Sequence, residues 1–111
     1  MKPGSEAERL TIYIGEEAKL GHRPMYEVIV EEARNRGLAG ATAMRCTMGF
    51  GSHHRIHTAK ILRLSEDLPV VIEIIDEPDQ IRSFLEYVQS HVTKGLVTLE
   101  KVRIVGGGIG E

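Results

Sequence analysis

Apolar residues recur along this chain with two different periods, which predict its strands and helices. At about residues 8 to 14 they occupy every second position, the pattern of a strand with one buried face. The same alternation predicts a second strand over residues 40 to 48. The nearly unbroken apolar run of residues 69 to 75 predicts a third strand, and its composition indicates that both faces of this strand are covered.

Two other segments have the i, i+3, i+4, i+7 spacing of an amphipathic helix. The first covers about residues 24 to 36, with Pro24 in its first turn and Gly37 at its end. The second begins at the acidic run of residues 76 to 79, because negative side chains are favourable at the positive end of a helix. Their apolar stripes are Tyr26, Ile29, Val30 and Ala33 in the first helix and Ile81, Phe84, Leu85 and Val88 in the second.

The last apolar segment, residues 96 to 105, predicts a fourth strand. Its apolar positions change parity, because Val97 and Leu99 share one face of a strand whereas Val102 lies on the other. A bulge or a break near Glu100 and Lys101 would account for this change, and we expect one there.

The predicted order is strand, helix, strand, strand, helix, strand, which is the ferredoxin-like βαββαβ plan of an α+β protein. Two helices cover only one face of a four-stranded sheet, so Val71 and Ile75 are candidates for the uncovered face. Exposed aliphatic residues there favour self-association. Cover by the long loop between the second and third strands is the alternative.

The composition is that of one folded domain. The chain has 111 residues, of which 41% are hydrophobic and 27% are charged. We therefore expect a single domain over residues 1–111, with a core at about residues 8–105 and a flexible glycine-rich tail at residues 106–111. Cys46 is the single cysteine, so no disulfide forms within the chain, and a cytoplasmic location is expected.

The charge balance argues against two classes of protein. The net charge of -2 does not suit a protein that coats nucleic acid or a membrane surface, because such proteins need a large positive field. No apolar run reaches the roughly 20 residues of a membrane-spanning helix. We therefore expect no nucleic-acid partner and no direct membrane insertion. The pairs Glu16–Glu17 and Glu31–Glu32 are interpreted as solvated surface.

Residues 48 to 65, MGFGSHHRIHTAKILRLS, form the most unusual segment of the sequence. It holds several basic residues and three of the five histidines, and it contains no carboxylate. The field around it is therefore expected to be positive, which suits an anionic ligand. Gly49 and Gly51 allow the backbone to approach such a ligand closely. A solvated hairpin loop is the competing interpretation of the same composition.

The histidines of this segment raise a second possibility. His53, His54 and His57 have spacings at which imidazoles share a zinc ion, so a metal-binding or hydrolytic protein is one alternative function. The segment has no clear fourth ligand, no HExxH motif and no orienting carboxylate, and we therefore expect neither a metal site nor a catalytic residue. A nucleic-acid interaction module is the other alternative, but the chain has only two Phe and three Tyr for base stacking.

Five segments of the sequence resemble one group of small proteins. The chain is similar to PII-like proteins that form a conserved family of unknown function and, more distantly, to the PII nitrogen-regulatory proteins, with which it shares the GFG element at the base of a T-loop. The resemblance implies a ferredoxin-like fold, a homotrimer and an adenine nucleotide in the cleft between subunits. The segments, which span about residues 8 to 105, are RLTIYIGE, RPMYEVIVEEAR, GLAGATAMRCTMGFG, HTAKILRLSEDLPVVIEIIDEP and GLVTLEKVRI.

PII proteins are not enzymes, and they report a bound nucleotide to a protein partner through the T-loop. The resemblance therefore implies a regulatory protein that requires no cofactor, has an adenine nucleotide as ligand and engages an unidentified protein partner. The T-loop-like segment is expected at about residues 50–62. The implied nucleotide-binding residues are Arg45, Gly49, Phe50, Gly51, Lys94, Gly95, Leu96 and Arg103, and the implied partner-facing residues are His53, His54, Arg55, His57 and Lys60.

The sequence departs from the PII pattern where phosphates bind. The segment that corresponds to the phosphate-binding B-loop is shortened to TKGLVTLE. Val71 and Ala43 stand where PII proteins have a phosphate-contacting lysine and a threonine that faces the base. With fewer phosphate ligands, AMP or ADP is favoured over ATP.

Overall fold

A four-stranded antiparallel sheet forms the framework of the protein. The computed structural model describes residues 1–50, 56–58 and 67–107. The strands of this sheet are β1 Glu6–Gly15, β4 Thr42–Arg45, β7 Pro69–Asp76 and β8 Leu96–Arg103. They are hydrogen-bonded in the order β4-β7-β1-β8, so β4 and β8 are the edges.

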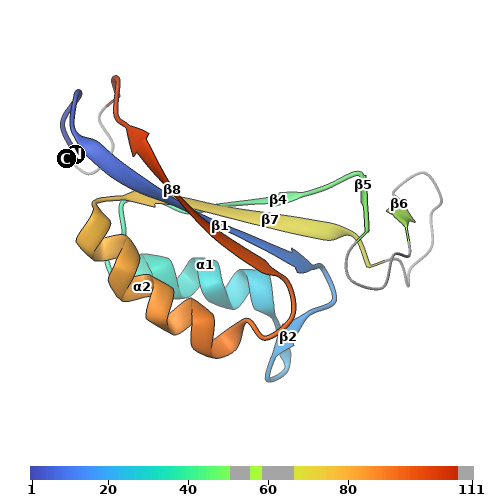
Figure 1. Cartoon of the computed structure of the whole chain (residues 1–111). Helices are drawn as coiled ribbons and strands as arrows, with labels where there is room; N and C mark the ends of the chain where they lie inside the picture. The colour runs from blue at the N-terminus through green and yellow to red at the C-terminus, as the bar shows by residue number, and fades with distance from the viewer. Residues whose placement is uncertain (51–55, 59–66, 108–111) are drawn as a thin grey trace.

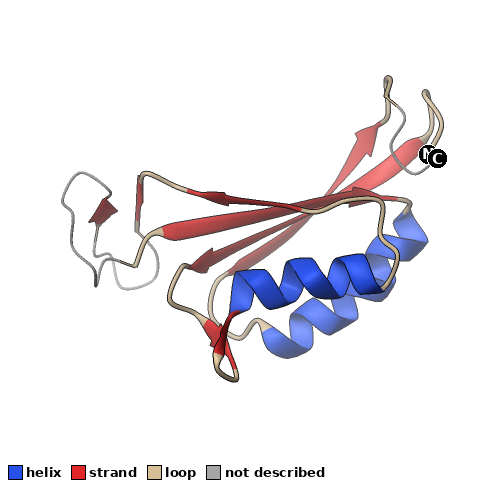
Figure 2. Ribbon diagram, turned by 180° about the vertical axis from the view of Figure 1, so that it is seen from behind, coloured by secondary structure: helices blue, strands red, loops and turns tan. Residues whose placement is uncertain are grey.

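Two helices, α1 Met25–Asn35 and α2 Pro78–His91, cover one face of this sheet (Figure 1 and Figure 2). α1 is followed by Gly37, whose φ of +77° lies in the left-handed region that favours glycine. α2 has Asp79 in its first turn, as the acidic run predicts. Two short ladders complete the described structure: β2 Lys19–Leu20 with β3 Arg23–Pro24, and β5 Met48–Gly49 with β6 His57–Thr58.

The predicted βαββαβ order is confirmed, and the fold is ferredoxin-like and of the α+β class. The strand expected over residues 40 to 48 is shorter in the main sheet. It ends at Arg45, and the chain then leaves the sheet to form β5. Most of the predicted T-loop-like segment and residues 108–111 of the predicted tail lie outside the described residues.

The predicted bulge near Glu100 is wrong. β8 pairs with β1 without interruption, from Leu96 opposite Tyr13 to Arg103 opposite Glu6. The change of parity has a different cause, which is the position of β8 at the edge of the sheet. An edge strand has little cover on either face, so its side chains follow no single buried face, and Leu99 is 39% exposed although it lies opposite the fully buried Leu10.

The hydrophobic core lies between the sheet and the helices. The alternate residues of β1 and β7 that face the helices are buried, whereas the intervening residues of β7 are half-buried. β7 is therefore fully covered on one face only, in contrast to the prediction from its apolar run. The largest fully buried side chains are Leu10, Ile12, Ile29, Ile72, Ile74, Ile81, Phe84 and Val88.

The open face of the sheet carries an apolar row that crosses all four strands. The register places Met44 opposite Val71, Val71 opposite Tyr13, and Tyr13 opposite Leu96. Directly opposite residues of antiparallel strands share a face, so these four side chains are neighbours. Tyr13 is 42% exposed, Met44 46% and Leu96 57%. The prediction that Val71 and Ile75 face away from the helices is confirmed, because they alternate with the buried Val70, Ile72 and Ile74.

Gly95, which precedes β8, offers a test of the β1–β8 junction. Its φ is +129°, and a Cβ atom at this position would collide with the carbonyl oxygen of Tyr13. Because this oxygen is backbone, it cannot move without disturbing the ladder. We expect Gly95→Ala to lower the free energy of unfolding by about 1–3 kcal/mol, measured by urea denaturation followed by circular dichroism.

Gly40→Ala is the matched control for this substitution. A Cβ atom at Gly40 meets nothing within 4 Å, so we expect its stability to equal or slightly exceed that of the wild type. A Gly95→Ala protein as stable as the Gly40→Ala protein would contradict the described packing.

Candidate functional site

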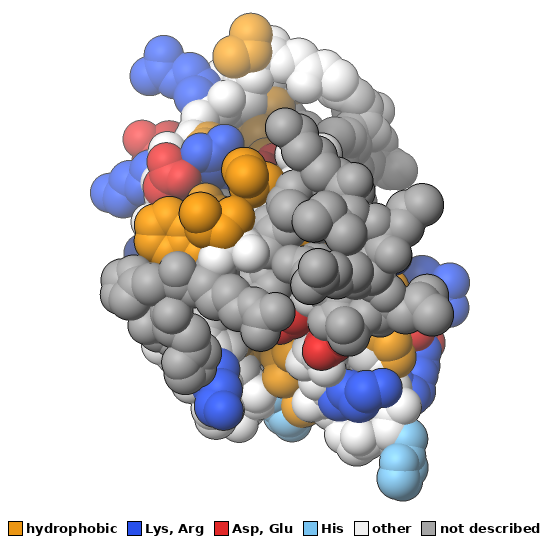
Figure 3. All heavy atoms as spheres, turned by 90° about the vertical axis from the view of Figure 1, so that its right-hand side faces the viewer, with side chains coloured by type: hydrophobic (Ala, Val, Ile, Leu, Met, Phe, Trp, Pro, Cys, Tyr) orange, Lys and Arg blue, Asp and Glu red, His pale blue; other side chains and the backbone are white. Residues whose placement is uncertain are grey.

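One end of the sheet gathers most of the predicted nucleotide-binding residues. β1 and β4 finish at this end, and β7 and β8 begin there, because each strand is antiparallel to its neighbours. Figure 3 looks onto this end and shows hydrophobic side chains gathered beside residues that are not described. The predicted residues that lie here are Arg45, Gly49 and Phe50 after or at the end of β4, and Lys94, Gly95 and Leu96 at the start of β8.

These residues form two groups on opposite edges of the sheet. β7 and β1 lie between β4 and β8. Neighbouring strands are about 4.8 Å apart, so the two edges are about 14 Å from each other. The segment that follows β4 and the segment that precedes β8 therefore do not surround one phosphate group within a single chain.

Arg103 lies away from both groups. It ends β8 and pairs with Glu6, at the opposite end of the sheet from Lys94. From Leu96, the first residue of β8, to Arg103 there are seven residue steps, which span about 23 Å. The structure therefore does not bring Arg103 to the other predicted binding residues of the same chain.

The remaining predicted residues belong to the segment after β5. Gly51 and the partner-facing residues His53, His54, Arg55 and Lys60 lie outside the described residues. The backbone of His57 is described and pairs with Gly49 in the β5–β6 ladder. Gly49 has no room for a side chain, because a Cβ atom there would come within 2.7 Å of Cγ of Pro69. The glycine thus allows the close approach of this segment to the start of β7.

The turn after β1 is attached to the start of β7 by two hydrogen bonds. The amide of Glu16 donates to the carbonyl oxygen of Leu68 at 2.8 Å. The amide of Glu17 donates to the carboxylate of Asp67, also at 2.8 Å. This carboxylate lies so close to Gly15 that a Cβ atom on the glycine would collide with it. Two carboxylates from distant parts of the sequence, Glu16 and Asp67, thereby reach the candidate site.

Arg45 is paired with one of these carboxylates. Its Nη2 lies 2.5 Å from Oε1 of Glu16. The side chain of Arg45 is 61% exposed and that of Glu16 is 25% exposed. The interpretation of the Glu16–Glu17 pair as solvated surface is thus wrong for Glu16, although Glu17 is exposed. The only signal in the sequence was the position of Glu16 immediately after a predicted strand, and that signal does not name its partner.

Two arginines that precede residues 48 to 65 in the chain are paired with carboxylates. Arg36 forms an ion pair with Glu32 at 2.7 Å, and Arg45 is paired with Glu16. Elsewhere on α1, the hydrogen bond from Arg23 holds the pKa of Glu31 below its usual range.

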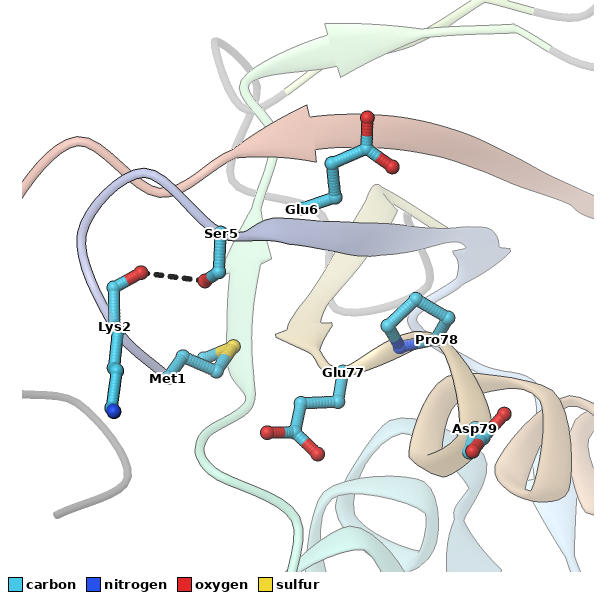
Figure 4. Close-up of a pocket in the computed structure, with 7 residues that line it drawn as sticks. All are labelled: Met1, Lys2, Ser5, Glu6, Glu77, Pro78 and Asp79. Carbon is cyan, nitrogen blue, oxygen red and sulfur yellow. Dashed lines mark hydrogen bonds between the residues drawn. The ribbon is translucent and has the colours of Figure 1, made fainter.

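A hollow lies at the other end of the molecule, near the N-terminus and the start of α2 (Figure 4). Its volume is about 500 Å³. Three of its side chains are carboxylates, which repel an anionic ligand, so we do not assign a nucleotide to it. The residues that line it are Met1, Lys2, Ser5, Glu6, Glu77, Pro78 and Asp79.

Two further observations concern the described part of the chain only. Within residues 1–50, 56–58 and 67–107, no group of three or more His, Cys, Asp or Glu side chains is arranged to hold a metal ion. The metal-binding alternative depends on His53 and His54, which lie outside these ranges, and it stays a prediction. In the same ranges neither helix is long and apolar enough to cross a membrane.

Comparison with known sequences identifies a family. The model of the DUF190 family, described as "Uncharacterized ACR", matches residues 7–104. A UPF0166 protein from Aquifex aeolicus is 40% identical over 96 residues, which cover 86% of this chain and 90% of that protein.

Comparison with solved structures finds PII-like proteins. CPII from Thiomonas intermedia, a nitrogen regulatory PII-like protein described as bound to ADP, AMP and bicarbonate, has a TM-score of 0.64 at 19% identity, and the match covers 90% of this chain and 89% of that chain. A PII-like signaling protein from Thermus thermophilus also has a TM-score of 0.64, at 17% identity and with 90% of both chains covered. At these identities the likeness shows the fold alone.

The sequence matches and the structural matches agree over nearly the whole chain. The family model covers the sheet and both helices, from Ala7 in β1 to Ile104 just after β8. The structural matches give the same arrangement of elements as PII-like proteins. The chain therefore belongs to the DUF190 family and has a PII-like fold, as its sequence resemblance predicts.

Proposed function

We propose that this protein is a PII-like regulator that binds an adenine nucleotide, AMP or ADP in preference to ATP. The nucleotide lies in a cleft between two subunits of a homotrimer, and the segment after Gly49 reports its presence to a protein partner. No residue has a catalytic role in this proposal. The observation that carries it is the PII-like fold with Arg45, Gly49 and Lys94 at one end of its sheet.

A shared cleft follows from the positions of the two candidate groups. Arg45 and Gly49 lie beside one edge of the sheet, and Lys94 lies beside the other. If the edge of one subunit faces the opposite edge of its neighbour, the two groups meet across the interface. The ligand that CPII is described as binding includes ADP and AMP, and this supports an adenine nucleotide as the ligand here.

The roles of the residues follow from their chemistry. Arg45 has a mostly exposed side chain, whose guanidinium donates charge-assisted hydrogen bonds to phosphate oxygens. Lys94 of the neighbouring subunit supplies a point charge, and Gly49 allows close approach of the backbone. So few cations favour a ligand with one or two phosphates over a triphosphate.

The open face of the sheet supports the homotrimer. The row of Met44, Val71, Tyr13 and Leu96 is too apolar to suit permanent contact with water. Nε of Arg9, on the same face, is buried and has no hydrogen-bond partner among the described residues. A neighbouring subunit would cover the row and offer an acceptor to this nitrogen.

Calorimetric titration with AMP, ADP, ATP and cyclic AMP tests the ligand. We expect AMP and ADP to bind more tightly than ATP, and Arg45→Gln to weaken them about tenfold because a charge-assisted hydrogen bond is lost. Arg34→Gln, which removes a positive charge from the exposed end of α1, is the control and should bind as the wild type does. Absence of heat with all four nucleotides in folded protein would refute the proposal.

Light scattering during size-exclusion chromatography tests the assembly. We expect the mass of a trimer for the wild type and a smaller species for Met44→Glu, because this change places a charge in the apolar row. Ser83→Glu places the same charge on the exposed surface of α2 and should leave the trimer intact. A wild-type monomer, or a Met44→Glu protein that assembles normally, would contradict the proposed interface.

A further inference from the structure

Glu16 and Arg45 are held in place by the same short segment at the start of β7. The amide of Glu16 donates a hydrogen bond to the carbonyl oxygen of Leu68 at 2.8 Å. The amide of Cys46, the residue after Arg45, donates one to the carbonyl oxygen of Pro69, also at 2.8 Å. The two side chains therefore meet across β7 from backbones that are already fixed. Little backbone entropy has to be lost to form their ion pair.

The ion pair is open to a ligand on one side. Only one hydrogen bond joins the side chains, from Nη2 of Arg45 to Oε1 of Glu16. The exposed fraction of the Arg45 side chain is 61%, against 25% for that of Glu16, so solvent reaches most of the arginine side chain while the glutamate side chain is largely covered. A carboxylate and a phosphate are recognised by the same fork of guanidinium donors. Glu16 thus occupies a position that a phosphate oxygen would take.

A second carboxylate lies beside the same turn as Glu16. Asp67 is fixed to the same turn by the amide of Glu17, at 2.8 Å. A ligand that reaches Arg45 therefore meets one carboxylate in direct contact with the guanidinium and another beside the same turn. Each additional negative charge on the ligand increases this repulsion.

From this geometry we propose that Glu16 is an internal competitor for the nucleotide phosphate at Arg45 and limits the negative charge that the site accepts. This inference rests on the proposed nucleotide-binding function. When AMP or ADP binds, the hydrogen bond between Arg45 and Glu16 is exchanged for one between Arg45 and a phosphate oxygen, and the carboxylate of Glu16 turns to water. No covalent bond changes in this exchange.

Calorimetric titration of the wild type and of Glu16→Gln with AMP, ADP and adenosine tests the inference. The exchange replaces an exposed ion pair, so we expect Glu16→Gln to bind AMP and ADP about two- to fivefold more tightly. Adenosine has no phosphate, and its affinity should not change. Glu17→Gln is the matched control: it removes the same charge from the adjacent, exposed position and should bind all three ligands as the wild type does.

A double-mutant cycle assigns the effect to Arg45. In protein that carries Arg45→Gln, the further change Glu16→Gln should leave the affinity for AMP unaltered, because the competition needs the guanidinium. Glu16→Asp keeps the charge but shortens the side chain by one methylene, and we expect an affinity between those of the wild type and Glu16→Gln. Circular dichroism verifies that each variant is folded.

The outcomes separate the inference from the proposed function. If the wild type binds AMP and Glu16→Gln binds it no more tightly, the inference fails and the proposed function stands. The inference also fails if Glu17→Gln has the same effect, or if adenosine affinity rises equally. If neither the wild type nor Glu16→Gln binds AMP or ADP, both fail. Binding by Glu16→Gln alone supports both, with a stronger competition than expected.

Discussion

The hydrogen-bonding order of the four strands is the constraint on which the rest of the structure depends. Because β7 and β1 occupy the centre, the two helices bury one face of these strands, and β4 and β8 become edges. Antiparallel pairing then brings the end of β4 and the start of β8 to the same end of the sheet. The strands β7 and β1 lie between them and keep them apart. Under the proposed function, a site that uses both segments takes them from two chains, and the uncovered apolar row is the surface that the second chain would contact.

The electrostatics of the candidate site follow from the same order. The turn after β1 lies next to the start of β7, so Glu16 and Asp67 reach a region whose own sequence contains only basic and neutral side chains. In the proposed site, Arg45 would therefore meet the nucleotide as one member of an ion pair, not as a free cation. In the described part of the chain, the candidate site has few cations and a carboxylate in contact with one of them, and this agrees with the proposed preference for AMP or ADP, which carry less negative charge than ATP.

Much of the fold could be predicted from the sequence, because its elements depend on local patterns. The periodicity gave both helices, and the acidic run marked the start of α2. The predictions of secondary structure were wrong where contacts between distant parts of the chain determine the structure. Local patterns do not report which strand is an edge, so the uneven parity of β8 was attributed to a bulge near Glu100 that does not exist. The end of β4 at Arg45 likewise depends on where the chain leaves the sheet.

The candidate site was less accessible to prediction. The family resemblance pointed to Arg45 and Lys94, and the structure places both at one end of the sheet. The pairing of Arg45 with Glu16 could not be foreseen, because 29 residues separate the two in the chain. Arg103 shows the opposite case, since it follows Lys94 closely in sequence but lies at the far end of β8.

A crystal structure of the protein grown with AMP tests the central claim most directly. We predict one nucleotide between two chains, with its phosphate at Arg45 of one chain and near Lys94 of its neighbour, in an assembly of three. AMP bound within a single chain, or in the acidic hollow beside Glu77, would contradict the account.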